Sequence, residues 1–393
     1  MTGLLRTLAV AYVALLPYQL RAGDHLNFAP ADCFLILIIL VAPGALCYRR
    51  RAWTIWHLGI VMTVCVGALV SSMRFGEIQR YELVNKCAGL SLPLLSYAAI
   101  TSCALTWFDI RRILRAFVFG VVVENTAAVG LFIGAYFFGI SNPLAQYGGM
   151  RLSGTLLDPN AYGGLLVAAF VICEGASYGH SPLISGLPLW IARASLILGI
   201  LFTFSRSAWA ALGVALLVLG AVRARTAARV LVSALAAAPC LFLLMGPRFV
   251  TIFQTMASRP KQVQGRFDLI HSALADFAAH PLLGGGLGSF RLGEREIAHN
   301  TAMWFLADFG IIGLLALMTF VGWFFVRAWQ TYRSAPPREQ PIALAMLVAH
   351  AAMLGLAMGI EAFYQRAWWM ILGLIAAGSC LTRPRPGTVL EDC

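Results

Sequence analysis

The segment Thr54–Met73, TIWHLGIVMTVCVGALVSSM, is a run of twenty residues without a single Asp, Glu, Lys or Arg. A helix needs about 20 mainly apolar residues to cross the hydrocarbon core of a bilayer. A transmembrane barrel would instead alternate apolar and polar residues in stretches of about 10. Because the apolar run is continuous, it predicts a membrane-spanning helix and not a strand.

The composition extends this prediction to the whole chain of 393 residues. Hydrophobic residues make up 60% of it and charged residues 12%, against about 45–50% and about 25% in an ordinary soluble domain. These values exclude a soluble, disordered or collagen-like protein. About twelve spanning helices would use roughly 240 positions. We therefore predict an all-α fold, a polytopic membrane bundle of about 12 transmembrane helices.

Charges and turn residues divide the chain into twelve predicted spans. They lie at 7–20, 31–48, 54–72, 87–107, 116–140, 160–178, 186–204, 207–222, 230–246, 309–326, 341–360 and 367–382. No small-x-small cleavage site follows the first apolar stretch, so we expect it to be retained as a helix. The predicted organisation is one membrane domain over 1–393, a large loop at 247–300 between the ninth and tenth spans, and a cytoplasmic tail at 383–393.

Arginines near the ends of the spans predict the orientation. Groups of them follow even-numbered spans: Arg49 to Arg51, Arg111, Arg112, Arg115, Arg223, Arg225, Arg229, Arg327, Arg333, Arg338, Arg383 and Arg385. Positive residues are enriched in cytoplasmic loops, so both termini should be cytoplasmic. The loops after the fifth, seventh and ninth spans must then share the other side. They hold three polar clusters, at 151–160, 205–206 and 246–300.

The long loop contains a predicted helix of its own. Apolar residues recur in it at spacings of three and four: Phe267, Ile270, Leu274 and Phe277. That periodicity is typical of an amphipathic helix, which could lie on the membrane surface or cap the bundle. Pro281 and the glycines from Gly284 to Gly286 would end it. Asn300 or Thr301 can cap the helix of the tenth span.

Three arginines on this shared side are candidate ligands of an anion. Arg206 interrupts an apolar stretch at the turn between two spans, Arg266 opens the amphipathic helix, and Arg151 lies in the first polar cluster. Each also has a plainer interpretation, as an interfacial arginine that reaches toward lipid phosphates. Together their guanidiniums could form a fork-shaped site for a diphosphate, because arginine presents paired donors and keeps its charge.

His299 is the candidate catalytic residue, since histidine can take a proton near neutral pH. Possible supporting residues are Asn300, Ser205 and Asp158, although Asp158 also fits a structural role as a helix N-cap. A lone histidine is often structural. We keep that interpretation for three further histidines: His271, His280 and His350.

Other charged groups and some absent motifs limit the chemistry. Glu124 and Glu361 lie within or beside spans, and we expect them to pair with arginines or to mark an ion path. The glycine run at 284–288 could offer N–H groups to a phosphate, but we expect a bend. There is no phosphate-loop motif, no Asp-x-Asp and no metal-ligand spacing. We therefore predict neither metal nor cofactor. The net charge of +12 indicates lipid head groups or a charged substrate as partners, and not nucleic acid.

Seven short motifs follow one another along the chain. They are Arg151-Leu-Ser-Gly154, Asp158-Pro-Asn160, Thr203-Phe-Ser-Arg206, Gly265-Arg266, His280-Pro-Leu-Leu-Gly284, Ala298-His-Asn300 and Asp308-Phe-Gly-Ile-Ile-Gly313. In order, spacing and sidedness this set resembles the O-antigen ligase/polymerase superfamily over essentially the whole chain.

The resemblance implies a helical membrane glycosyltransferase, similar in fold to the C-type class, in the bacterial inner membrane. Its active site and its loop at 247–300 would face the periplasm. The two family arginines correspond to Arg206 and Arg266, which Arg151 could assist, and the family histidine corresponds to His299. The implied donor is a glycan on undecaprenyl diphosphate, and the implied acceptor is the lipid A-core oligosaccharide. The transfer would need no metal and would invert the anomeric carbon.

Three functions remain open at this point. A ligase is favoured, because only one loop is long and no arginine predicted to lie outside has the Arg-x10-Gly pattern that resembles classical polymerases. An O-antigen or exopolysaccharide polymerase with the same donor is the alternative. An ion or solute transporter is the alternative of another class, suggested by Glu124, Glu361 and His350.

Overall fold

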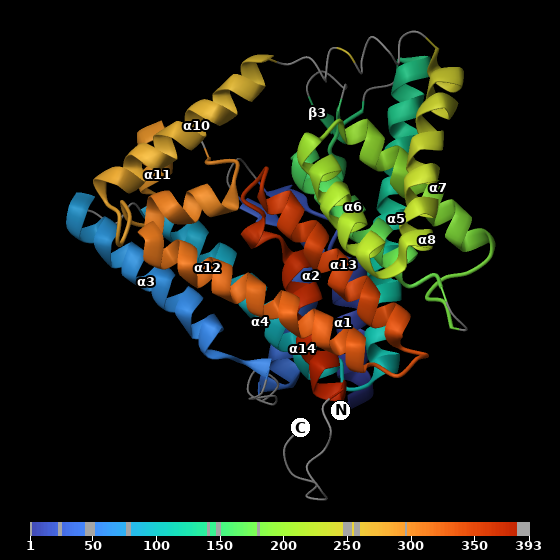
Figure 1. The fold of residues 1–393 in the computed structure, drawn as a ribbon, viewed down its shortest axis with the longest axis horizontal. Helices are drawn as coiled ribbons and strands as arrows, with labels where there is room; N and C mark the ends of the chain where they lie inside the picture. Colours follow the sequence, from blue (N-terminus) through green and yellow to red (C-terminus); the bar gives the residue numbers. More distant parts are fainter. Residues whose placement is uncertain are drawn as a thin grey trace, which may run out of the picture.

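The computed structural model describes residues 2–22, 26–43, 52–75, 80–139, 142–146, 151–178, 181–246, 254, 260–294 and 297–382. Most of them lie in helices (Figure 1). The α-helices are α1 (Thr2–Ala14), α2 (Pro30–Val41), α3 (Ile55–Phe75), α4 (Arg80–Cys103), α5 (Trp107–Phe138), α6 (Pro159–Gly175), α7 (Leu187–Thr203), α8 (Arg206–Met245), α10 (Pro260–Ala279), α11 (Ser289–Glu294), α12 (Thr301–Ser334), α13 (Gln340–Ala357) and α14 (Arg366–Thr382).

Short elements connect some of these helices. Two turns of 3-10 helix are η3 (Gly154–Leu156) and η4 (Ala362–Tyr364). Two small antiparallel ribbons pair β1 (Leu20–Ala22) with β2 (Leu26–Phe28), and β3 (Ala145–Gln146) with β4 (Arg151–Leu152). The ribbons were not predicted, because strands of two or three residues leave no periodicity to detect.

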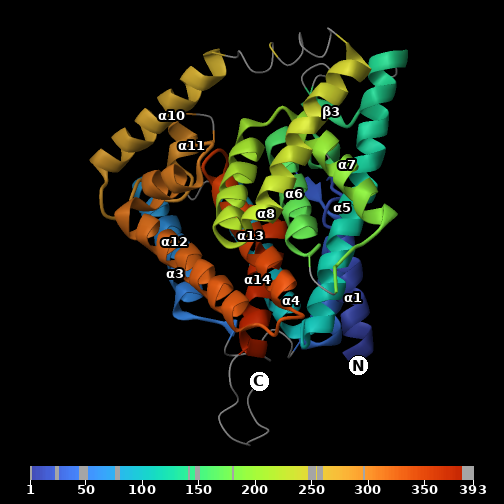
Figure 2. The same ribbon diagram turned by 45° about the vertical axis from the view of Figure 1, so that its right-hand side comes forward.

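Three helices, α6, α13 and α14, form the centre of the bundle. Nearly every residue of α6 and α13 is buried, as expected for helices that are apolar on all faces. Helix α13 packs against α6, α8 and α12, and α14 packs against α4. Figures 1 and 2 show α5, α7 and α8 on one side of this centre and α3 and α12 on the other. In both views α1 begins and α14 ends at the lower edge, whereas α10 lies along the upper edge.

The helices are those of a membrane protein. Among the described residues, five are long and apolar enough to cross a membrane: Ile55–Phe75, Trp107–Phe138, Arg206–Ser233, Thr301–Ser334 and Gln340–Ala357. Several shorter apolar helices accompany them. Each of the predicted spans overlaps one of the observed helices, so the prediction of an all-α membrane fold is confirmed. The eighth and ninth predicted spans both lie in α8, which Arg223 divides into two parts with non-helical φ and ψ of −143° and 70°.

Small residues bring together the helices that carry the candidate site. A Cβ atom added at Gly163 in α6 would lie 2.7 Å from the Cβ of Ala208 in α8. One added at Gly355 in α13 would lie 2.9 Å from the Cα of Ala211 in α8. Close packing through small residues is typical of helix pairs in membranes. It places the start of α8 beside the start of α6 and the end of α13.

The segment before α12 contains the predicted amphipathic helix as α10, which packs against α12. Helix α12 begins directly after Asn300, as predicted, and Gly310 then interrupts it with φ of 64° and ψ of −161°. A Cβ atom at Gly310 would lie 2.5 Å from the carbonyl oxygen of Leu282, so only glycine fits there. The predicted tail at 383–393 and most of 247–259 lie outside the described residues.

Candidate active site

Three helices of the described chain begin in the same unusual way. Before the cap of α6, α8 and α12 stands a non-glycine residue in the left-handed region: Leu157 (φ 65°), Phe204 (φ 46°) and His299 (φ 48°). Among the described residues, only these three combine a side chain with positive φ. Such strain costs about 1–3 kcal/mol per residue and gathers at functional sites. We name the segments Leu157–Asn160, Phe204–Ser207 and His299–Thr301 the helix-start cluster.

Each of the three helices has a side-chain cap. Asp158 Oδ1 accepts a backbone N–H of α6 at 2.9 Å, Ser205 Oγ accepts one of α8 at 3.2 Å, and Asn300 Oδ1 accepts one of α12 at 3.1 Å. The predicted caps at Asp158 and Asn300 are confirmed. Ser205 has the same role, which sequence analysis did not assign to it. The sequence signal was present, because serine is a preferred N-cap.

Hydrogen bonds join the starts of α6 and α8. The Oδ1 atom of Asn160 accepts from the guanidinium of Arg151 at 3.0 Å and from Ser205 Oγ at 2.9 Å. Arg151 is buried, and its Nε also donates to the carbonyl oxygen of Thr203 at 2.8 Å. Arg151 therefore holds the turn that leads into Arg206.

Helix α10 brings a second arginine to the start of α8. Arg266 NH1 lies 3.5 Å from Ser207 Oγ, and that hydroxyl donates to the carbonyl oxygen of Gly359 at 3.2 Å. Arg206, the first residue of α8, is half-buried, and its guanidinium forms no hydrogen bond or ion pair with any residue that the structure describes. A guanidinium in this state at a helix N-terminus favours the binding of an anion.

The start of α12 contacts the same turn after α13. Asn300 Nδ2 donates to the carbonyl oxygen of Met358 at 3.1 Å, and Thr301 Oγ1 donates to that of Ile360 at 2.9 Å. Because Ser207 contacts Gly359, the turn at 358–360 touches the starts of both α8 and α12. The predicted site residues Arg206, Arg266 and His299 are thus joined through their immediate neighbours.

The buried acids have other partners than the arginines predicted for them. Glu124 accepts from the hydroxyl of Tyr162 and, at 3.0 Å, from the backbone N of Thr155. Glu361 forms an ion pair of 2.8 Å with Lys86. The prediction of arginine partners was wrong for both residues. The reason is tertiary packing, since the donors come from other helices and no sequence spacing links them to the acids.

His350 has the structural role expected of it. Its Nδ1 accepts from Trp368 Nε1 at 2.9 Å, and its Nε2 lies 3.1 Å from the carbonyl oxygen of Val321. One ring nitrogen accepts and the other donates, which is the pattern of a neutral imidazole. Both nitrogens are therefore engaged inside the bundle.

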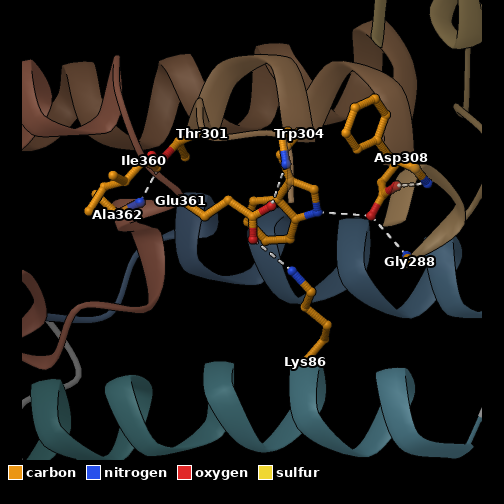
Figure 3. Close-up of polar contacts among 10 residues, drawn as sticks. Lys86, Gly288, Thr301, Trp304, Asp308, Ile360, Glu361 and Ala362 are labelled. Atoms are coloured by element: carbon orange, nitrogen blue, oxygen red, sulfur yellow. Dashed lines mark hydrogen bonds and ion pairs between the residues drawn. The ribbon is translucent and has the colours of Figure 1, made fainter. Parts of the chain in front are cut away.

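A polar cluster around Asp308 was missed by the sequence analysis. Asp308 accepts four hydrogen bonds of 2.8–3.1 Å, from Gly288 N, Ser289 Oγ, Phe290 N and Trp304 Nε1. Figure 3 shows those from Gly288 and Trp304. The glycine run before it is a bend, as expected, because Gly285 N and Gly286 N donate to backbone carbonyls of α12 at 2.8 and 3.0 Å. The signal for this cluster was the Asp308-Phe-Gly310 sequence in the last family motif.

The helix-start cluster combines positive charge with a possible proton acceptor. Two guanidiniums and three helix N-termini favour a phosphate group, and an imidazole can take a proton from a hydroxyl. Within the described ranges, no three His, Cys, Asp or Glu side chains gather into a group that could hold a metal ion. The arrangement is suited to a substrate that carries both an anionic group and a reacting centre.

A comparison with known families matched one part of the chain. Residues 191–318 match the family model described as O-antigen ligase. The matched segment contains Arg206, Arg266 and His299, and covers about a third of the chain. The protein is a membrane helical protein, and residues 191–318 are similar to the O-antigen ligase family, which includes ligases and polymerases. A comparison with curated proteins gave no match.

Proposed function

We propose that the protein is an O-antigen ligase of the bacterial inner membrane. It transfers a glycan from undecaprenyl diphosphate to the lipid A-core oligosaccharide at the periplasmic face. The observation that carries this proposal is that Ser207 and Asn300, the neighbours of Arg206 and His299, both contact the turn at 358–360. Arg266 lies 3.5 Å from the hydroxyl of the same Ser207. The family match over 191–318 supports the same class of donor.

Arg206 and Arg266 bind the diphosphate in this proposal. Arg206 has no partner among the described residues, and Arg266 lies at the first turn of α8 through Ser207. Paired N–H donors match phosphate oxygens, and the positive charge stabilises the charge that develops as the diphosphate departs. Arg151 contributes mainly by fixing the turn before Arg206, because two of its nitrogens donate to Thr203 and Asn160.

His299 acts on the acceptor in this proposal. It takes the proton of the acceptor hydroxyl while the hydroxyl oxygen attacks the anomeric carbon. The bond between that carbon and the diphosphate oxygen breaks, and undecaprenyl diphosphate leaves with the electron pair. A single displacement inverts the anomeric centre. Since diphosphate is a good leaving group, the second carboxylic acid that glycosidases use has no task here.

A ligase is proposed over a polymerase on the pattern of the loops, as the sequence indicates. The polymerase alternative uses the same donor and the same arginines, so it differs only in the acceptor. No structural observation favours a transporter, because Glu124, Glu361 and His350 are each engaged in hydrogen bonds or ion pairs within the described chain.

The decisive experiment supplies purified protein with lipid-linked glycans of one and of several repeat units. Lipid A-core is the acceptor, and EDTA is present. We expect glycan attached to the core lipid, detected by mass spectrometry, without added metal or nucleotide. Longer glycans on undecaprenyl diphosphate would instead identify a polymerase. Loss of product under chelation would contradict the arginine-based mechanism, and ion movement in liposomes without transfer would contradict the enzyme.

His299→Ala is the matched test of the catalytic role. We expect it to abolish transfer and to leave the protein folded in the membrane. A His271→Ala variant serves as the control, because His271 is an exposed histidine on α10. Wild-type transfer by His299→Ala would refute the proposed base.

A further inference from the structure

Glu361 connects three parts of the chain next to the helix-start cluster. Its Oε2 lies 2.8 Å from Lys86 Nζ in α4, and its Oε1 accepts from the backbone N of Ala298 at 3.3 Å. Ala298 directly precedes His299. Both charged side chains are only 10% exposed, so water screens the pair weakly. Figure 3 shows Glu361 reaching from the turn after α13 toward Lys86.

Lys86 is fixed by aromatic rings as well as by charge. Its Nζ lies 4.4 Å from the ring centroid of Trp304 and 5.1 Å from that of Tyr364. Trp304 belongs to α12 and is itself anchored, because its Nε1 donates to Asp308 at 2.8 Å. Cation–π contacts add to the ion pair. Lys86 therefore holds the carboxylate of Glu361 in one orientation.

The backbone at His299 depends on contacts of this kind. Its φ of 48° is costly for a residue with a Cβ atom. Hydrogen bonds restrain it on both sides, through Ala298 N before it and through Thr301 Oγ1 after it. The Thr301 hydroxyl donates to Ile360 O and accepts from Ala362 N, both at 2.9 Å (Figure 3). On the N-terminal side, Glu361 supplies the restraint.

We infer that Glu361, held by Lys86, is a positioning residue for His299. It fixes the peptide between Ile297 and Ala298, one residue before His299, and thereby the place of the imidazole beside the acceptor hydroxyl. The inference rests on the proposed function, because it takes His299 as the base. Glu361 touches neither substrate in this account. A misplacement of about 1 Å at a reacting group can cost on the order of 100-fold in rate.

Two double variants test this role. Lys86→Met with Glu361→Gln removes both charges and keeps a carbonyl oxygen for Ala298 N. Lys86→Met with Glu361→Met removes the same charges and the acceptor as well. We expect the second to turn over about 100-fold more slowly than the first, with a donor KM within about threefold. Equal turnover numbers would overturn the inference.

Each turnover number is divided by the fraction of protein molecules that bind undecaprenyl diphosphate without a glycan. This ligand is the probe because, in the proposed function, Arg206 and Arg266 bind its diphosphate. This normalisation removes any fraction of either variant that fails to fold. A purely structural role of Glu361 would lower the binding-competent fraction and leave the normalised turnover equal in the two variants. A difference in normalised turnover is therefore specific to positioning.

The same pair of double variants is then made in a His299→Ala background. If His299 is the group being positioned, the two variants now share one residual rate, and a persisting difference would overturn the inference. Failure of the proposed function has a different signature. In that case His299→Ala alone turns over at the wild-type rate, whatever the double variants do.

Discussion

The helix-start cluster and the polar cluster around Asp308 each contain a charged side chain, but the two side chains differ in their hydrogen-bond partners. Asp308 is 1% exposed, and its two oxygens accept four hydrogen bonds from the chain itself. A carboxylate has about four acceptor positions, so this one is saturated. Arg206 is half-buried and has no partner among the described residues. Its donors remain available to a ligand.

The difference shows that a charged residue in a membrane protein is not a functional site by burial alone. What distinguishes a functional site is a charged side chain whose hydrogen-bonding groups are not all used within the protein. His350 belongs with Asp308, since both ring nitrogens are engaged. Glu361 lies between the two cases, because its partners belong to the chain itself but one of them is the backbone N of Ala298, the residue before His299. Substitutions in the two clusters should therefore fail in different ways.

The largest effect is expected at Arg206. Replacing it, as Arg206→Gln, removes a charged donor from the departing diphosphate and should lower kcat/KM by about 10²- to 10³-fold, or about 3–4 kcal/mol. Stability should be unchanged, because no internal hydrogen bond is lost. Steady-state kinetics and thermal unfolding in detergent measure the two quantities.

Two further substitutions control this result. Arg206→Lys keeps the charge but not the paired donors, so it should recover little of the activity. Arg225→Gln removes an exposed arginine elsewhere on α8 and should leave kcat/KM unchanged. If the melting temperature of Arg206→Gln fell together with its activity, Arg206 would be bonded within the protein, as Asp308 is.

Asp308→Asn should have the opposite signature. The amide nitrogen cannot accept the hydrogen bonds that one carboxylate oxygen accepts in the wild-type protein. The N–H groups that donate to that oxygen would then be buried without partners, at a cost of about 2–4 kcal/mol. We expect a lower melting temperature and a lower yield of folded protein. Turnover per folded molecule should stay near the wild-type value. A normal melting temperature with lost turnover would place Asp308 in the active site.

The sequence predicts those features of the fold and of the candidate site that depend on residues close together in the chain. Continuous apolar runs predict the helices, and Asp158 and Asn300 are recognisable as caps because capping depends on residues within one turn. The pairing of Lys86 with Glu361 joins residues 275 positions apart, and no spacing rule reaches that far. The left-handed backbone at Leu157, Phe204 and His299 is equally invisible, because it results from how the helices pack.

A smaller effect is expected for Trp368→Phe, which tests a side chain whose hydrogen bonds are all internal, that of His350. The variant keeps the buried ring and removes the indole donor from His350 Nδ1, now bonded at 2.9 Å. An unpaired buried acceptor should lower the free energy of unfolding by about 1–2 kcal/mol. Transfer should be unaffected, and denaturant unfolding measures the change. Altered transfer in this variant would instead link His350 to the reaction.

The smallest effect is expected at Ser207, which contacts both Arg266 and the backbone of Gly359. Its hydroxyl lies 3.5 Å from Arg266 NH1 and donates to Gly359 O at 3.2 Å. Ser207→Ala leaves both arginine charges in place and removes two long hydrogen bonds, of which the one from Arg266 is worth about 0.5–1.5 kcal/mol. The donor KM should therefore rise about three- to tenfold, with kcat unchanged, because the hydrogen bonds around His299 are kept.

The control is Ser379→Ala. Ser379 is a buried serine of α14 that donates to Ala376 O at 2.9 Å, and its replacement should leave KM unchanged. A fall in kcat for Ser207→Ala would mean that the hydroxyl itself acts on the substrate.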